Sequence, residues 1–285
     1  MKSKNDHISQ MHDEMLYTSL RIRAGNAGGS GTVLFSKEVK TGESETYILT
    51  NHHVVDDSIK VEEDWDSLLG RKIKKEKRST VKAEIFQYNF LSRNVGQKAL
   101  DTDIVAYDSR VDLALLKLRD INALGNVAYI IPQDGVRDIH IYDEVIAVGA
   151  QLGVPPISTS GFIVYMDSEI DNERFNMGTY NSIYGSSGGA VFRYSEERKH
   201  YEFIGVPARV TVMPKMFDVE TISHMSYFIP IESVFTFLKE WCYDFIFDPR
   251  INVQDCHKKR DSKRTEARKS IERMYGMVEP DEGKK

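Results

Sequence analysis

The chain has 285 residues, of which 41% are hydrophobic and 28% charged, and its formal net charge is −5. This composition is typical of a soluble globular protein and excludes a disordered or membrane-embedded chain. The negative balance argues against nucleic-acid binding over the whole surface. No apolar stretch of the kind found in secretory signals lies near the start. We therefore expect a cytoplasmic protein without membrane contact.

The cysteine content is low. Cys242 and Cys256 are the only two cysteines, and they match neither a disulfide framework nor zinc-ligand spacing. We expect both to be packing residues in a reducing compartment. The sequence indicates no metal site and no cofactor.

Short strands separated by turns dominate the pattern. The candidate strands are rich in β-branched and aromatic residues and are bounded by Gly, Pro, Asn and Asp, which favours an all-β sandwich or barrel. They are residues 17–23, 32–35, 46–50, 81–87, 103–108, 113–118, 144–149, 161–166, 189–194, 201–206, 208–213 and 225–229. The stretch 120–135 reads as a connection. We place boundaries that divide the chain into residues 1–135, 136–248 and 249–285.

One helix is predicted over residues 230–247, where apolar residues recur at helical spacing. Pro230 stands where proline is tolerated at a helix start, and Asp248 and Pro249 end the pattern. We expect this helix to pack on a barrel.

Two segments are basic. Residues 71–78 predict a solvated loop or a protruding helical insert. Between His257 and Arg273, eight basic residues stand against three acidic ones, and the apolar face is thin. A helix, disorder, and folding on a partner all stay open for this segment. We expect a mobile tail, dispensable for the chemistry, that engages an acidic protein partner.

The segment YGSSGGAVF, residues 184–192, places two serines among three glycines. Most such clusters are tight loops. A serine hydroxyl becomes a nucleophile only with an imidazole that takes its proton and a carboxylate that orients the imidazole. The chain offers histidines in YILTNHHVV and an aspartate in VDLALLKL, in the order His, Asp, Ser.

Six segments in this order resemble the trypsin-like serine peptidases of the chymotrypsin fold, specifically the HtrA-type branch. They are GGSGTVLF, YILTNHHVV, VDLALLKL, YGSSGGAVF, FIGV and SYFIPIESV, and they lie within residues 16–245. The resemblance implies two antiparallel six-stranded β-barrels followed by a packing helix and a charged tail. It places the base and acid in the first barrel, the nucleophile in the second, and the site in the cleft between them.

The resemblance also assigns the base and the acid. His53 is the expected base, because it stands three residues after Thr50 and directly before two valines. His52 occupies a variable position, and we expect it to point away from the cleft. Asp112 is the expected orienting acid. The neighbouring aspartates are interpreted as loop and strand-end charges, namely Asp101, Asp103 and Asp108.

Ser187 is the expected nucleophile, because it directly precedes two glycines. Gly185, Ser186 and Ser187 form the expected oxyanion hole, in which the backbone N–H groups of Gly185 and Ser187 converge. The implied reaction is acyl transfer: serine attacks a peptide carbonyl and water later releases the acyl-enzyme.

By the same family register, the substrate-binding pocket is lined by Asn181, Ala208, Arg209, Val210 and Ser226. No carboxylate stands at its base, so a preference for Lys or Arg is not expected. The side chains of Val210 and Ser226 narrow the opening, which favours small or medium aliphatic residues such as Val, Ala or Leu. Segments 157–165 and 206–210 are expected to approach the cleft, where a substrate strand can pair.

Three features depart from the resemblance. Only about forty residues follow the predicted helix, too few for the PDZ domain of many HtrA-type proteins. Ser186 replaces the Asn or Asp that usually precedes the nucleophile, and a long insert occupies residues 62–103.

The alternative to an active endopeptidase is a pseudoprotease-like module that binds a protein through the cleft or the basic tail. Nucleic-acid binding lacks an aromatic platform, and an oligomer stays open.

Overall fold

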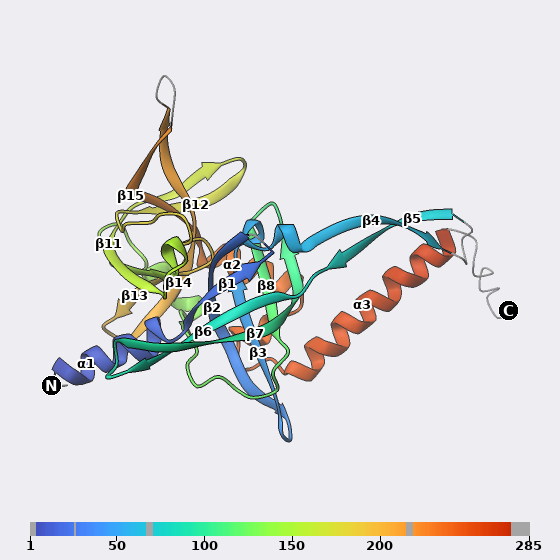
Figure 1. The fold of residues 1–285 in the computed structure, drawn as a ribbon, viewed down its shortest axis with the longest axis horizontal. Helices are drawn as coiled ribbons and strands as arrows, with labels where there is room; N and C mark the ends of the chain where they lie inside the picture. The colour runs from blue at the N-terminus through green and yellow to red at the C-terminus, as the bar shows by residue number, and fades with distance from the viewer. Residues whose placement is uncertain (1–3, 26, 67–70, 215–218, 275–285) are drawn as a thin grey trace.

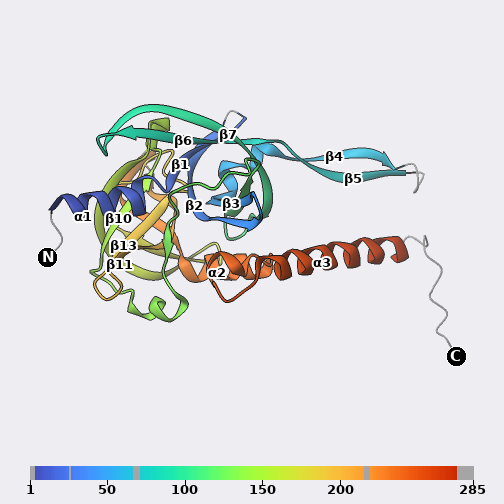
Figure 2. The ribbon, with the colours of Figure 1, turned by 90° about the horizontal axis from the view of Figure 1, so that it is seen from below.

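The computed structural model describes residues 4–25, 27–66, 71–214 and 219–274 (Figure 1). The chain starts with helix α1 (Lys4–Met11) and a π-helical turn (His12–Leu16). Two sets of strands follow. A two-stranded ribbon (residues 59–66 and 71–78) and a long helix (residues 253–274) both extend toward the same end of the molecule (Figures 1 and 2). None of the helices in the described residues is both long and apolar enough to cross a membrane.

The first set of strands closes into a barrel in the order β1-β2-β3-β8-β7-β6. Alternating apolar and polar side chains along the strands give the barrel its buried interior. In β1, for example, Leu20 and Ile22 are buried inside, whereas Arg21 and Arg23 point outward. The strands are β1 (Ser19–Ala24), β2 (Ala27–Lys40), β3 (Glu43–Thr50), β6 (Val81–Asn89), β7 (Arg93–Asp108) and β8 (Leu113–Leu118).

The second set forms a ring in the order β13-β10-β11-β12-β15-β14, closed by the pairing of β13 with β14. A short strand, β9 (Tyr129–Ile130), adds to β14 in parallel. The ring strands are β10 (Glu144–Gly149), β11 (Ile157–Ile170), β12 (Glu173–Gly178), β13 (Ala190–Ser195), β14 (His200–Pro214) and β15 (Val219–Pro230). The predicted chymotrypsin-type fold, with two antiparallel six-stranded barrels and a C-terminal helix, is confirmed.

The predicted helix over residues 230–247 is too long. Helix α2 runs over Ile231–Glu240, and a separate 3₁₀ turn covers Asp244–Ile246. Cys242 adopts a φ of 58°, which an α-helix cannot contain, and the N–H of Tyr243 caps the helix by donating to the carbonyl of Leu238. The apolar residues after Glu240 fit helical spacing but enter the core from a turn.

The basic segment 71–78 is neither a loop nor a helix. It is strand β5 (Arg71–Arg78), and it pairs with β4 (Ile59–Asp66) in a two-stranded hairpin that projects from the first barrel (Figure 2). Opposite charges meet across the two strands, for example Lys77 with Glu62 at 2.6 Å and Lys75 with Asp64 at 3.3 Å. Cross-strand ion pairs of this kind favour a ribbon over a loop of like charges.

The start of the basic tail packs on the body of the protein. Helix α3 (Val253–Met274) carries Cys256 into the core, where its side chain is fully buried. The guanidinium of Arg260 lies 4.0 Å from the ring centroid of Tyr243 and donates to the carbonyl of Cys242 at 2.5 Å. The expectation of a mobile tail is therefore wrong for the first turns of α3, because buried contacts order them. Residues 275–285 lie outside the described residues.

Glu45 joins α3 to the first barrel. Its nearly buried carboxylate accepts hydrogen bonds from Lys117 Nζ (2.5 Å), Tyr47 Oη (2.9 Å) and His257 Nε2 (3.0 Å). Burial opposes ionisation of Glu45, but the hydrogen bonds from Lys117 and Tyr47 outweigh it and hold the pKa of Glu45 below its usual value. Burial lowers the pKa of His257 despite the attraction of Glu45.

A chain that ends at Asn252 should lose about 2–4 kcal/mol of unfolding free energy, because it lacks the buried Cys256 and the Arg260–Tyr243 contact. A chain that ends at Arg264 keeps these contacts and should unfold within about 0.5 kcal/mol of the full chain. Urea denaturation of the three proteins measures the difference. Equal stability of the two truncated chains would contradict a structural role for α3.

The contribution of Glu45 to the free energy of unfolding should decrease as the pH falls. The folded pKa of Glu45 is lowered, so its contribution is complete above the usual glutamate value, 4.5, and is lost as the pH drops through the folded value. The stability difference between the wild type and Glu45→Gln should therefore be large at pH 7 and shrink toward pH 3. Urea denaturation at several pH values tests this, and a difference that does not change with pH would refute it.

Candidate active site

The imidazole of His53 and the carboxylate of Asp112 meet at one end of the first barrel. β3 ends at Thr50 and β8 begins at Leu113, and the two strands are neighbours in which Thr50 lies opposite Ala114. Residues that follow β3 and precede β8 must therefore lie close together. His53 Nδ1 donates to Asp112 Oδ2 at 2.7 Å, and the His53 backbone N–H donates to Oδ1 at 2.9 Å.

This two-point contact sets the state of the ring. Because a carboxylate can only accept, the proton of a neutral His53 lies on Nδ1, and Nε2 keeps a free lone pair. The His53 side chain is 46% exposed. The arrangement provides an oriented base.

Asp112 is held in an unusual conformation. Its φ is 54°, in the left-handed region. Its backbone carbonyl accepts two hydrogen bonds, from the N–H of His52 at 3.2 Å and from Asn51 Nδ2 at 2.8 Å.

The ring of His52 stacks on Tyr107 with centroids 5.1 Å apart. The other nearby aspartates are engaged elsewhere, Asp101 with Lys82, Asp103 with Arg119 and Asp108 with Arg110.

The loop that carries Ser187 reaches the same end of the first barrel. Gly185 and Gly188 have φ values of 95° and 83°, which favour glycine. A Cβ on Gly188 would lie 2.3 Å from both the carbonyl oxygen of Ser30 and Thr50 Oγ1. Only glycine allows this approach, and it places the residue after Ser187 against the end of β3.

Ser30 ties the two barrels together at this point. Its N–H donates to the carbonyl of Ser187 (2.8 Å), and its Oγ donates to the carbonyl of Gly185 (2.6 Å). The same Oγ accepts from the N–H of Ala150 (2.7 Å), and the Ser30 carbonyl accepts from Thr50 Oγ1 (2.7 Å). The sequence analysis missed this role, although Ser30 stands inside the quoted GGSGTVLF segment.

The polar groups around Ser187 differ in their availability. Among the described residues, neither the Ser187 hydroxyl nor the N–H groups of Gly185 and Ser187 have a protein partner. The carbonyl of Tyr184 accepts from the N–H of Leu152 at 2.7 Å, which directs the Gly185 N–H to the opposite side of that trans peptide. The N–H of Ser186, in contrast, donates to Ile183 at 3.0 Å.

The residues expected to line the substrate pocket lie in the second barrel. β14 contacts the serine loop, because the Gly188 N–H donates to the carbonyl of Pro207 at 3.2 Å. Val210 lies opposite Ser226 across β14 and β15, and Ser226 is buried and donates to the carbonyl of Ser223 at 3.2 Å. Ala208, two residues before Val210 on β14, is partly buried.

Two of the expected pocket residues have other contacts. Arg209 pairs with Asp171 at 2.7 Å, and its guanidinium lies 4.9 Å from the ring centroid of Phe175. Asn181 is exposed, and its backbone carbonyl accepts from Thr159 Oγ1 at 2.7 Å. Thr159 belongs to β11, within the segment expected near the cleft.

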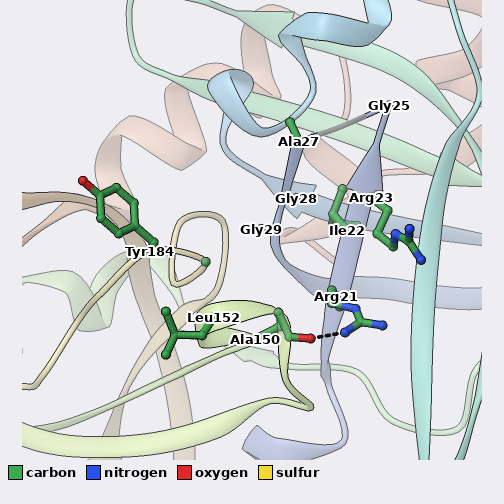
Figure 3. Close-up of a pocket in the computed structure, with 12 residues that line it drawn as sticks. Arg21, Ile22, Arg23, Gly25, Ala27, Gly28, Gly29, Ala150, Leu152 and Tyr184 are labelled. Carbon is green, nitrogen blue, oxygen red and sulfur yellow. Dashed lines mark hydrogen bonds between the residues drawn. The ribbon is translucent and has the colours of Figure 1, made fainter.

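A cavity of about 510 Å³ opens beside the serine loop, between the two barrels. One side is made by β1 and the start of β2, including Arg21, Arg23 and Gly29. The other side is made by the backbone around Ala150 and Gly185 together with Leu152 and Tyr184, whose side chains project away from β1 (Figure 3). The sequence analysis expected a cleft between the barrels, but of the residues that line this cavity it assigned a role only to Gly185.

The chain matches the trypsin-like peptidase domain over residues 29–199. It belongs to the trypsin-like peptidase family. This membership supports serine peptidase activity in general, and the matched range contains His53, Asp112 and Ser187. No curated protein matches the chain. Within the described part of the chain, no group of three or more His, Cys, Asp or Glu side chains could hold a metal ion.

Ser30→Ala should slow the reaction of Ser187 with a fluorophosphonate about 10- to 100-fold, because the Gly185 carbonyl and the Ala150 N–H lose the hydroxyl that holds the loop. Ser36→Ala is the matched control on the same strand. The Ser36 hydroxyl also has two bonds, to Thr46 Oγ1 and from the N–H of Leu124, both at 2.7 Å.

Both serine variants should lose about 1–2 kcal/mol of unfolding free energy. Only Ser30→Ala should lose reactivity beyond its loss of folded protein. Equal labelling rates for the two variants would show that Ser30 is merely structural.

Proposed function

We propose that this chain is a serine endopeptidase that cleaves peptide bonds with Ser187 as nucleophile, His53 as base and Asp112 as orienting acid. The observation that supports this most directly is the two-point contact between His53 and Asp112. It leaves Nε2 as the free acceptor at the place where Gly188 packs the serine loop against the first barrel. Within the trypsin-like peptidases, the quoted motifs favour the HtrA-type branch.

The proposed reaction begins when Ser187 Oγ attacks the peptide carbonyl carbon and His53 Nε2 takes the hydroxyl proton. The resulting imidazolium is stabilised by Asp112, which stays ionised. His53 then gives the proton to the leaving amine as the C–N bond breaks, and an acyl-enzyme remains. A water molecule attacks the acyl carbon, again with His53 as base, and releases the acid and free Ser187.

The N–H groups of Gly185 and Ser187 are the proposed donors to the oxyanion. Both lack protein acceptors among the described residues, so they can bind the developing charge without first breaking a bond. Ser186 contributes differently: its N–H and Oγ both bond to Ile183, which tightens the turn. We assign it the shape of the loop and not a donor role.

The proposed acyl-side pocket lies along β14 and β15. Val210 and Ser226 face each other there, and the buried Ser226 leaves little depth. Asn181 and Ala208 complete the proposed rim, whereas the Arg209 guanidinium is already paired with Asp171. This pocket suits a small or medium aliphatic side chain such as Val, Ala or Leu before the scissile bond.

Labelling with a fluorophosphonate probe tests the proposed function. Wild type should be labelled, and Ser187→Ala and His53→Ala should lose peptide turnover by about 10⁴-fold or more. His52→Ala and Ser186→Ala should have mild effects, since His52 stacks on Tyr107 and the Ser186 hydroxyl is only a turn contact.

Two results would overturn the proposal. If His52→Ala lost peptide turnover while His53→Ala kept it, the assignment of the base would be displaced by one residue. A folded wild type that is never labelled and cleaves no peptide would instead support the protein-binding module.

A further inference from the structure

A small cavity of about 120 Å³ lies where α3 leaves the body of the protein beside α2 (Figure 2). Its apolar lining comes from Val105 on β7 and from Trp241, which directly follows α2. Arg260, Lys263 and Arg264 line the rest. Their spacing of three and four residues puts these cations on one face of α3. None of the lining residues is a proposed catalytic residue, so the cavity is independent of the proposed function.

Two of the cations are held by the end of α2. A helix leaves its last carbonyl groups without partners inside the helix. Lys263 Nζ donates to the carbonyl of Glu240 at 3.2 Å, and Arg260 Nη1 donates to the carbonyl of Cys242 at 2.5 Å. An ammonium has three donors and a guanidinium has five. Both side chains therefore keep donors for a ligand.

The positive charge of the cavity has no partner in the protein. Among the described residues, none of the three cations forms an ion pair with a carboxylate, and Arg264 has no polar partner at all. The charges of Arg260 and Arg264 both reach Tyr243. Burial raises the pKa of Tyr243, and these two charges oppose the rise. The excess of positive charge favours an anionic ligand.

The acidic groups nearby do not cancel this excess. Within the described residues, Glu240 is the one acidic residue of the lining. It is exposed, and it also lines an adjoining cavity together with Arg110. Asp244 is close enough for the charge of Lys263 to act on its carboxyl group, but the two form no ion pair. Arg264 in particular stays available.

An acidic side chain matches this lining. Its carboxylate can accept two parallel hydrogen bonds from the guanidinium of Arg264, and further bonds from the remaining donors of Lys263 and Arg260. Its methylene groups can lie against Trp241 and Val105. Glutamate suits this better than aspartate, because its longer stem reaches the apolar lining while the carboxylate meets the cations.

A protein segment fits this surface better than a nucleic acid. Phosphate backbones are bound by runs of cations, but carboxylates interrupt the basic residues of α3 at Asp255, Asp261 and Glu266. Trp and Arg are the residue types enriched among those that carry most of the binding energy between proteins. Trp241 is 36% exposed beside three cations, which is the combination expected at such a contact.

We propose that this cavity is the docking site for an acidic segment of a partner protein. A glutamate of that segment binds to Arg264, Lys263 and Arg260, and its stem packs on Trp241. Because Arg260 and Lys263 also join α3 to the end of α2, the partner binds at a fixed part of the basic helix and not at its far end.

The two tryptophans of the chain can report where a peptide binds. In Trp65→Phe, Trp241 is the only tryptophan, and in Trp241→Phe only Trp65 on β4 is left. A short peptide of several glutamates flanked by Gly and Ser should change the emission of the Trp65→Phe protein and leave that of Trp241→Phe unchanged. A change seen only from Trp65 would place binding on the ribbon and overturn the proposal.

Fluorescence anisotropy of the labelled peptide measures the affinity. At low salt the full chain should bind the glutamate peptide about tenfold more tightly than its glutamine version, as expected for a charge-assisted pair. This preference should shrink as salt is added. Arg264→Gln should reduce it by about threefold or more, and Arg264→Glu should favour a lysine peptide. Equal binding of the glutamate and glutamine peptides by the full chain would refute the site.

Lys258→Gln is the matched control. It removes one positive charge from the same helix, at an exposed residue that pairs with Asp255 and does not line the cavity. It should bind the peptide like wild type, and both variants should unfold at the urea concentration of wild type. An equal loss of binding in Lys258→Gln and Arg264→Gln would mean that only the overall charge of α3 matters.

Other occupants of the cavity would be recognised in the same measurements. Emission of Trp241 that changes with protein concentration alone would indicate a second copy of the chain. Residues 275–285 contain the acidic run EPDE, so tighter peptide binding by a chain that ends at Met274 would show that these residues compete for the cavity. A labelled oligonucleotide that binds more tightly than the glutamate peptide would indicate a nucleic acid. Each of these results would overturn the proposal.

Discussion

The close approach of Gly188 to Ser30 and Thr50 is the contact on which the site depends. A Cβ at residue 188 would lie 2.3 Å from two oxygens of the first barrel, so this loop can dock only with glycine there. Ser30 then holds the docked loop through the carbonyls of Gly185 and Ser187. Because these bonds cross from one barrel to the other, the position of Ser187 relative to His53 is a property of the interface and not of either barrel.

Two carboxylates of the first barrel, Asp112 and Glu45, each hold a neighbouring segment in place by accepting several hydrogen bonds. Asp112 accepts both the backbone and the ring N–H of His53, which fixes an imidazole that is otherwise nearly half exposed. Glu45 similarly gathers Lys117 and His257 and thereby anchors α3. In both cases a carboxylate that accepts from several donors helps to hold a segment in place, since charge-assisted hydrogen bonds are stronger than neutral ones.

Periodicity predicted the elements well wherever one face is buried, and failed where other contacts decide. The alternation in β1 and the helical spacing after Pro230 both correspond to real elements. The spacing does not show that Cys242 turns left-handed and ends α2, because that turn follows from packing of Phe245 and Ile246 into the core. Strand β5 escaped prediction because its partner β4, and not its own composition, makes it a strand.

The sequence by itself determined the family and the order of His53, Asp112 and Ser187, because each of these proposed catalytic residues stands in a short motif whose neighbours are local in the chain. Only the tertiary structure decided what surrounds them. Ser30 and Gly185 are 155 residues apart, and β1 lies across the cavity from Leu152 and Tyr184 only because the two barrels pack at this edge. Contacts between distant segments leave no periodic or local signal in a single sequence. The loop support and the cavity between the barrels therefore appear only once the chain is folded.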